Sequence, residues 1–319
     1  MRALQRHSDG VHNDLPVDMS HSTISTNSRL TALRARSSQG WSGGRWGLVL
    51  MGGGNRGAIQ AGALRALFET GFSPGLIVGI SVGAINGAYL AFYPDYQGTL
   101  ELEQIWRRLD GKSLFGTKHL VARTLLALAT RRSAALSNRG LKRLLESSLP
   151  SRDFADTAVP FLVTATHLET GTGRILAEGN IVDAVLASSA LPGFLPPVTV
   201  DGEHLIDGAV AEPVPLQLAR QRGLAGMVVI DPGYACRCPC VHDTALAVVQ
   251  HSVALLARQC VIARFEASDN DAKVFPIGLS CHEDVPFTDF TRTEEMLRSG
   301  YEEARRILAT RVGVGEPAS

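Results

Sequence analysis

Two stretches in the first third of the chain share one pattern: a short apolar run, a tight glycine-containing turn and a helix-forming segment. In the first, the apolar run covers residues 47–51, the glycines lie within residues 52–57, and apolar side chains recur at helical spacing over residues 58–69. In the second, the run covers residues 76–80, the turn is at Ser81, and the helix covers residues 82–92. Two such units in succession predict a parallel sheet, so the sequence indicates the α/β class.

The remaining segments extend this pattern to a parallel-rich sheet flanked by helices. Residues 100–149 are typical of helices and predict a helical insertion or cap. Residues 198–200 and 203–206 flank an Asp-Gly pair, which favours a hairpin turn. Thr291 and Glu294 have capping-box spacing before the last helix. Further strands are expected at residues 160–165, 174–177, 227–230 and 273–277, and further helices at residues 181–187, 214–221, 245–265 and 294–309.

Residues 76–93 are nearly as apolar as a membrane span, since only Ser81 and Asn86 interrupt them. Glycines at 79, 83 and 87, together with Ser81, divide the stretch into a strand and a helix. The following residues 94–97 also lack the basic side chains that anchor a span. We therefore predict no transmembrane helix here.

The chain divides into three parts by composition. Residues 1–44 are rich in Ser, Thr, Asn, His and Arg without apolar periodicity, which predicts a disordered or loosely ordered tail. Residues 45–312 contain no clear linker and are expected to form one α/β domain, followed by a C-terminal tail at 313–319. No apolar run typical of a signal peptide occurs in the first 40 residues, which predicts a cytoplasmic location.

Charge and cysteine content exclude some classes of protein. Lys and Arg number 31, as do Asp and Glu, and this zero net charge argues against a dedicated nucleic-acid binder. The five cysteines are an odd number spread over 319 residues, unlike a secreted disulfide framework.

The sequence Gly79-Ile-Ser81-Val-Gly83 is the strongest local signal for chemistry. It is a G-x-S-x-G motif between a predicted strand and a predicted helix. A serine at such a turn projects its hydroxyl outward, and the helix that follows directs its positive N-terminus toward the site. The motif therefore predicts a nucleophile elbow, with a glycine-rich turn and an incidental serine as the alternative.

The first turn, at residues 52–57, admits two interpretations. As G-x-G-x-x-G it fits a dinucleotide fingerprint, and as a loop of free backbone N–H groups it fits an oxyanion hole. A dinucleotide site expects an acidic residue near the end of the second strand, but Ser81 occupies that place. The oxyanion interpretation is therefore favoured.

A serine nucleophile needs a base, and the residues alone leave several candidates. Asp207 follows a predicted strand and stands at a turn with the small residues Gly208 and Ala209, although an Asp in a turn is often only a capping residue. Histidines that follow Ser81 allow a Ser-Asp-His triad by order alone; they are His167, His204, His242, His251 and His282.

Four motifs in this order resemble those of the patatin-like phospholipase family, over roughly residues 46–230. They are the glycine-rich loop 52–57, the elbow 79–83, the segment ASSALPGFLPP at 187–197, and Asp207-Gly208-Ala209. The resemblance implies a patatin-like α/β hydrolase domain at residues 45–312 that hydrolyses lipid acyl esters, as a phospholipase A or lysophospholipase does.

The resemblance also implies the roles of individual residues. Ser81 would be the nucleophile and Asp207 the base of a Ser-Asp dyad without histidine, acting through an acyl-enzyme. The oxyanion hole would come from the backbone of Gly52, Gly53 and Gly54, and supporting motif residues would be Asn55, Arg56, Gly57, Gly79, Gly83, Gly208 and Ala209. Two departures are mild, because Val82 stands where Ala is frequent and Ala209 where a second Gly is usual.

Partners and cofactors follow from the same residues. Residues 118–132 mix leucines with basic side chains, which suits either an anionic membrane interface or a cap helix packed on the core. The spacing of Cys236, Cys238 and Cys240 is poor for zinc, so we predict no metal and no cofactor. Two alternatives remain open: a nucleotide-binding oxidoreductase that uses the 52–57 loop, and a catalytically idle lipid-binding protein.

Overall fold

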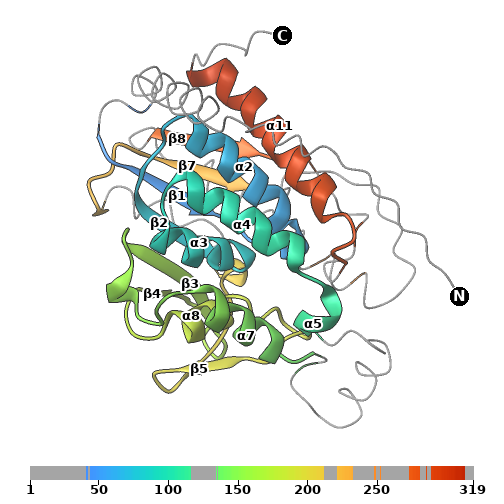
Figure 1. Ribbon diagram of the computed structural model, residues 1–319. Coiled ribbons are helices and arrows are strands. Elements are labelled where there is room, and N and C mark those ends of the chain that lie inside the picture. Colours follow the sequence, from blue (N-terminus) through green and yellow to red (C-terminus); the bar gives the residue numbers. More distant parts are fainter. Residues whose placement is uncertain are drawn as a thin grey trace, which may run out of the picture.

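The computed structural model describes residues 41, 44–115, 134, 136–211, 221–232, 248, 252, 273–280, 285 and 289–312. Its centre is an eight-stranded sheet in the order β5-β6-β3-β2-β1-β7-β8, with β4 paired to β3 (Figure 1). Strands β3, β2, β1, β7 and β8 run parallel, and β4, β5 and β6 add antiparallel pairs. The predicted α/β class and parallel-rich sheet are confirmed.

The strands lie close to their predicted places. Their bounds are β1 Trp46–Leu50, β2 Pro74–Ile80, β3 Phe161–His167, β4 Gly173–Leu176, β5 Val198–Val200, β6 Glu203–Asp207, β7 Gly226–Asp231 and β8 Lys273–Gly278. Asp201 and Gly202 join β5 to β6 with φ values of 52° and 82°, as a two-residue hairpin turn requires.

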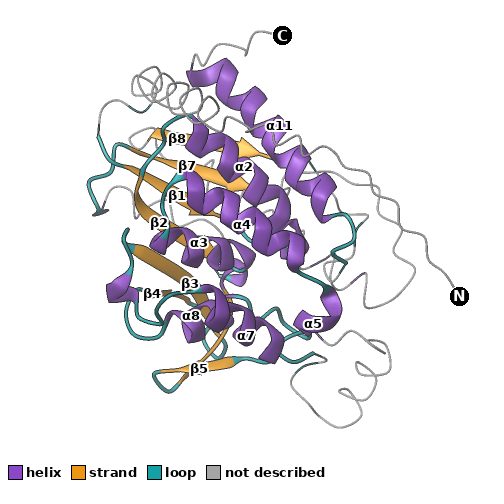
Figure 2. Ribbon diagram, viewed as in Figure 1, coloured by secondary structure: helices purple, strands orange, loops and turns teal. Residues whose placement is uncertain are grey.

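Helices cover the sheet and fill the crossovers (Figure 2). Their bounds are α2 Gly57–Glu69, α3 Val82–Phe92, α4 Tyr96–Arg108, α5 Gly111–Phe115, α7 Arg139–Ser148, α8 Ile181–Ser188 and α11 Thr293–Val312, with 3-10 turns η1 Gly54–Arg56, η2 Phe154–Asp156 and η3 Gly208–Val210. The apolar stretch 76–93 is thus divided between β2 and α3 as predicted. Within the described parts of the chain, no helix has both the length and the apolarity needed to cross a bilayer.

Alternate residues of the central strands belong to two apolar cores, one on each face of the sheet. On β1, Leu48 and Leu50 join the larger core, which includes α2, α3, α8 and α11, whereas Val49 joins the smaller one. This period of two is the pleat of a strand buried on both faces.

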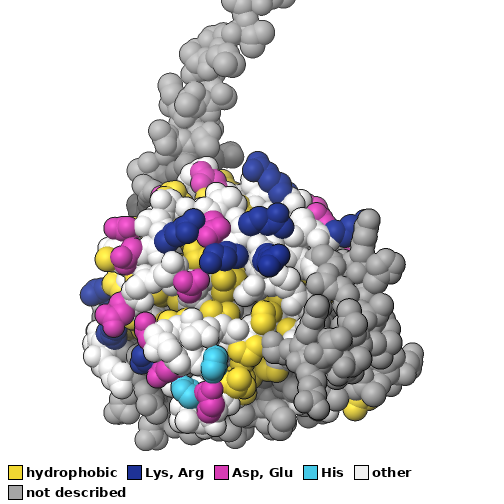
Figure 3. All heavy atoms as spheres, turned by 90° about the horizontal axis from the view of Figure 1, so that it is seen from below, with side chains coloured by type: hydrophobic (Ala, Val, Ile, Leu, Met, Phe, Trp, Pro, Cys, Tyr) yellow, Lys and Arg dark blue, Asp and Glu magenta, His cyan; other side chains and the backbone are white. Residues whose placement is uncertain are grey.

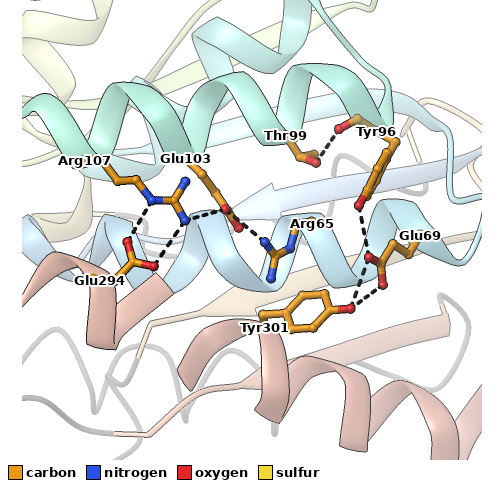
Figure 4. Close-up of polar contacts among 8 residues, drawn as sticks. All are labelled: Arg65, Glu69, Tyr96, Thr99, Glu103, Arg107, Glu294 and Tyr301. Atoms are coloured by element: carbon orange, nitrogen blue, oxygen red, sulfur yellow. Dashed lines mark hydrogen bonds and ion pairs between the residues drawn. The ribbon is translucent and has the colours of Figure 1, made fainter. Parts of the chain in front are cut away.

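Helices α2, α4 and α11 are joined by polar contacts as well as apolar packing (Figure 4). The buried carboxylate of Glu103 on α4 contacts Arg65 of α2 and Arg107, each at 3.1 Å, and Arg107 also pairs with Glu294 of α11 at 2.7 Å. Beside them, Glu69 accepts hydrogen bonds from Tyr96 and Tyr301. Helix α4, which covers the start of the predicted helical insertion at residues 100–149, therefore belongs to the main helical layer.

Two further expectations need correction or extension. The predicted capping box is wrong, because α11 begins at Thr293 and the carboxylate of Glu294 pairs with Arg107 instead. Trp41 lies within the predicted tail, yet its ring contacts Trp46, Phe72 and Phe275. The predicted helices at 118–132, 214–221 and 245–265 lie almost wholly outside the described residues.

Candidate active site

Ser81 occupies a strained turn between β2 and α3. Its φ of 54° and ψ of −123° are rare for a residue with a side chain. The flanking glycines permit the close approach that this turn needs: a Cβ added at Gly83 would lie 2.0 Å from the carbonyl oxygen of Leu50, and one at Gly79 would lie 2.4 Å from Cα of Ala84. The G-x-S-x-G spacing is thus explained by contacts of the backbone with β1 and with the first turn of α3.

Asp207 is the last residue of β6, and its side chain meets Ser81. The Ser81 hydroxyl donates to Oδ2 of Asp207 at 2.7 Å, and the backbone N–H of Ala209 donates to Oδ1 at 2.9 Å. Asp207 faces Ala165 on β3, and β3 lies next to β2, whose last residue directly precedes Ser81. Neighbouring strands therefore bring together two residues that are 126 positions apart.

Burial makes this carboxylate a better base than an exposed one. Asp207 is 2% exposed, and burial raises its pKa from 3.8 to about 6, although the hydrogen bonds from Ser81 and Ala209 each act to lower it. At neutral pH the group is ionised, and its affinity for a proton exceeds that of an ordinary aspartate.

The glycine-rich loop follows β1, the neighbour of β2 on its other side. Its turn uses a positive φ of 62° at Gly54, and the backbone N–H groups of Gly52, Gly53 and Gly54 have no acceptor among the described residues. An N–H group that has no acceptor within the protein costs free energy. It can therefore donate favourably to an oxygen of a bound ligand. The chain thus places free donors beside the strand that carries Ser81.

The other residues of this loop hold its shape. The Arg56 guanidinium donates from Nε to the carbonyl of Gly53 at 3.0 Å, and Asn55 donates from Nδ2 to the carbonyl of Asp289 at 2.6 Å. A Cβ at Gly57 would lie 2.4 Å from side-chain atoms of both Trp106 and Val82. Val82, a departure from the family pattern, is therefore packed against the end of the loop.

A buried polar network beneath the loop is a feature that sequence reasoning missed. Gln60 donates to the carbonyl of Met51 at 3.1 Å, and Asn86 donates to the carbonyl of Gly57 at 3.0 Å and to the side chain of Gln60 at 2.9 Å. The indole N–H of Trp106 completes it by donating to Asn86 at 2.8 Å. The one signal in the sequence was a polar Asn86 in an otherwise apolar helix.

The described histidines lie together, away from these contacts. His167 and His204 each place Nδ1 near the carboxylate of Glu169, at 3.1 and 2.9 Å. Among the described residues, the Ser81 hydroxyl donates to the side chain of Asp207 alone. His242, His251 and His282 lie outside the described residues. The structure therefore joins Ser81 to the aspartate candidate rather than to His167 or His204.

Among the described residues, no three His, Cys, Asp or Glu side chains gather in a way that would hold a metal ion. All five cysteines lie outside the described residues.

Comparison with known proteins places this site in a family. The model of the family described as patatin-like phospholipase matches residues 48–220, more than half of the chain. Similar proteins include patatin-like phospholipase domain-containing protein 7 of Mus musculus, 31% identical over 188 residues, and the neuropathy target esterase sws of Drosophila melanogaster, 27% identical over 189. The matches cover 58% and 59% of this chain but only 13% of each relative's length.

A solved structure supports the same architecture. VipD from Legionella pneumophila aligns with a TM-score of 0.52 at 15% identity, over 84% of this chain and 67% of that one. At this identity the likeness shows the fold alone. The family match covers the glycine-rich loop, the elbow and Asp207, and it shows that the chain belongs to the patatin-like phospholipase family.

Proposed function

We propose that the protein is a lipid acyl hydrolase that cleaves carboxylic esters, of the phospholipase A or lysophospholipase type, through a dyad of Ser81 and Asp207. The observation that carries the proposal is the 2.7 Å hydrogen bond from the Ser81 hydroxyl to a carboxylate whose pKa is raised by burial. A nucleophile in contact with a base of increased proton affinity is the arrangement that acyl transfer requires.

In the proposed reaction, Asp207 accepts the proton of Ser81 as Oγ attacks the ester carbonyl. The backbone amides of Gly52, Gly53 and Gly54 stabilise the negative charge on the former carbonyl oxygen. The protonated Asp207 then donates its proton to the leaving alcohol, which leaves an acyl-enzyme on Ser81. Asp207 next takes a proton from water, which attacks the acyl group. It then returns this proton to Oγ of Ser81 as the acyl bond breaks, which releases the carboxylic acid and regenerates both residues.

The remaining motif residues would support this chemistry. Asn55, Arg56 and Gly57 keep the loop in place, Gly79 and Gly83 permit the elbow, and Ala209 orients the carboxylate of Asp207. A Cβ at Gly208 would lie 2.3 Å from the carbonyl of Thr164, so glycine there allows the Asp207 turn to lie against β3. We assign these roles to a hydrolase domain at residues 45–312.

Apolar side chains near the site favour a lipid substrate and peripheral contact with a membrane. Val210, three residues after Asp207, is 44% exposed. Figure 3 shows one face of the molecule on which a band of apolar side chains lies between a group of Lys and Arg side chains and the histidines. Such a mixture is typical of surfaces that lie at a lipid interface.

The test is labelling with a fluorescent alkyl phosphonate, together with hydrolysis of a short-chain nitrophenyl ester. We expect the wild type to label and turn over, Ser81→Ala to lose both, and Asp207→Asn to remain folded with turnover reduced at least about 100-fold. The conservative Thr99→Val, in α4, serves as a control that should retain both activities. A folded wild type that neither labels nor hydrolyses would contradict the proposal, and a nucleotide-dependent rise in its melting temperature would favour the oxidoreductase alternative.

A further inference from the structure

The backbone of Ser81 is held from outside its own strand and helix by two serine hydroxyls. The N–H of Ser81 donates to Oγ of Ser188 at 2.9 Å, and Oγ of Ser189 donates to the carbonyl of Ser81 at 3.3 Å. Both serines belong to the ASSALP segment, to which the proposed reaction gives no role. Ser188 is fully buried, so its hydroxyl is not a group that water readily replaces.

Ala190, the next residue of the same turn, contacts Asp207, the other member of the proposed dyad. The backbone N–H of Asp207 donates to the carbonyl of Ala190 at 3.1 Å. The carbonyl of Asp207 accepts from Oγ1 of Thr166, on β3, at 2.8 Å. Residues 188–190 therefore form hydrogen bonds with the backbone of both Ser81 and Asp207.

This turn is itself firmly placed. It ends helix α8, whose first turn is capped by Asn180 through hydrogen bonds from the N–H groups of Val182 and Asp183. The N–H of Ser189 donates to the carbonyl of Val185, and that of Ala190 to the carbonyl of Ala187. Helix α8 also packs against α3, β3, β5 and β6. The turn is thus a rigid support between the nucleophile elbow and the strand that carries Asp207.

Ser81 needs such a support because its conformation is strained. A residue with a side chain at φ 54° stays there only when its surroundings hold it, and the strain amounts to about 1–3 kcal/mol. If the N–H of Ser81 loses its acceptor, the turn lowers its free energy by rotating toward a relaxed conformation in which this N–H finds another acceptor. Such a rotation carries Oγ away from Asp207.

We propose that residues 188–190 are a positioning clamp that sets the distance between Ser81 and Asp207, with Ser188 as the principal positioning residue. This inference rests on the proposed function, because the distance matters for a dyad. Ser188 acts through the backbone of Ser81 and touches no reacting atom.

The decisive variant is Ser188→Ala, which removes the acceptor and keeps Cβ. On a soluble nitrophenyl ester we expect kcat to fall about 10- to 100-fold with KM nearly unchanged, since misplacing a reacting group by about 1 Å has an effect of this size. Retention of kcat within twofold would overturn the proposal.

The pH profile separates positioning from general loss of structure. The hydrogen bond from Ser81 lowers the pKa of Asp207, so a displaced hydroxyl moves the midpoint of kcat/KM upward from about 6. Charged groups on the neighbouring strands point elsewhere: His167 and His204 pair with Glu169, and Arg174 with Glu203. A variant that is only partly folded would lose activity at every pH without moving the midpoint, and an unmoved midpoint in the folded variant would contradict the clamp.

Hydrogen exchange tests the clamp without relying on turnover. We expect the Ser81 amide to exchange faster in Ser188→Ala than in wild type, and amides of β7 to remain unchanged. Unchanged protection at Ser81 would overturn the clamp even if the wild type hydrolysed no ester, whereas a wild type that fails to label with phosphonate would contradict only the proposed function.

Two more variants distinguish loss of the hydrogen bond from misfolding. Ser189→Ala removes only the longer 3.3 Å bond and should lower kcat less than Ser188→Ala does, and Ser188→Cys retains a weak acceptor and should give an intermediate kcat. The control is Thr99→Val, which loses a fully buried hydroxyl bonded to the carbonyl of Tyr96 at 2.7 Å in α4. It should keep both kcat and the midpoint, and equal effects of Thr99→Val and Ser188→Ala would overturn the proposal.

Discussion

At the scale of single residues, the site combines two groups held in unfavourable states. Ser81 has a backbone conformation that costs free energy, and Asp207 is a buried carboxylate that accepts hydrogen bonds from the uncharged donors of Ser81 and Ala209. Each is also what the proposed reaction needs, because strain exposes the hydroxyl and burial increases the proton affinity of the base. Removing either state should stabilise the fold while it removes activity.

Asp207→Asn tests whether the buried carboxylate destabilises the fold, through the pH dependence of stability. The folded pKa of about 6 exceeds the unfolded value of 3.8, so wild-type stability falls as pH rises from about 4 to about 6 and then stays lower. The Asn side chain has no such dependence. We expect the free energy of unfolding of Asp207→Asn, relative to wild type, to increase by about 2 kcal/mol between pH 4 and pH 8.

Urea denaturation of both proteins at the two pH values measures this difference. Effects of all other titrating groups cancel between the two proteins, so the comparison isolates the carboxylate. A difference that does not change with pH would mean that Asp207 is well solvated, and the argument for a strengthened base would fail.

At the scale of elements, helices α2 and α11 approach each other closely at two glycines. A Cβ at Gly62 would lie 1.9 Å from the carbonyl oxygen of Leu297, and one at Gly300 would lie 1.9 Å from that of Ile59. Each helix thus presents a glycine to the backbone of the other. This contact holds the C-terminal helix against the helix that follows the glycine-rich loop.

Gly300→Ala should separate these helices. Ala is favoured over Gly within a helix by about 1 kcal/mol, but a clash with backbone cannot be relieved by a change of rotamer. We expect a net loss of about 2 kcal/mol in the free energy of unfolding, measured by urea denaturation. Gly278→Ala in β8 is the matched control, because its Cβ would meet open space, and a loss as large as that of Gly300→Ala would contradict the explanation.

At the scale of the whole molecule, contacts distant in sequence hold the site and the sheet together. Ser81 is 107 positions from Ser188 and 126 from Asp207, and the loop residue Asn55 is 234 positions from Asp289. An aromatic cluster also joins segments that are distant in sequence, since Trp41 contacts Trp46 of β1 and Phe275 of β8. The packed chain therefore includes Trp41, four residues before the predicted domain start at residue 45.

Trp41→Ala measures how much this contact contributes. The side chain is partly buried and its indole N–H donates to Thr70 at 2.9 Å, so we expect a loss of about 2 kcal/mol, less than for a fully buried Trp. Trp41→Phe keeps an aromatic ring and loses the hydrogen bond, and should cost about 1 kcal/mol. Wild-type stability in Trp41→Ala would instead support the predicted boundary at residue 45.

Local patterns in the sequence predicted the parts of this protein that depend on near neighbours. Residues 76–92 were assigned a strand, a turn at Ser81 and a helix, and the structure has β2 and α3 there, because apolar periodicity and glycine act over a few residues. The hairpin at Asp201 and Gly202 followed for the same reason. The capping box failed because Arg107, 187 positions away, binds Glu294.

Tertiary structure decided which of these local pieces meet. The contact between Ser81 and Asp207 depended on the pairing of β3 with β6, and the positions of Ser188 and Ser189 depended on the packing of α8. Burial of Asp207 and the polar network of Gln60 and Asn86 arise from several elements at once. A single sequence encodes these contacts only through the complete fold, because strand order and burial are properties of the assembled chain rather than of any segment.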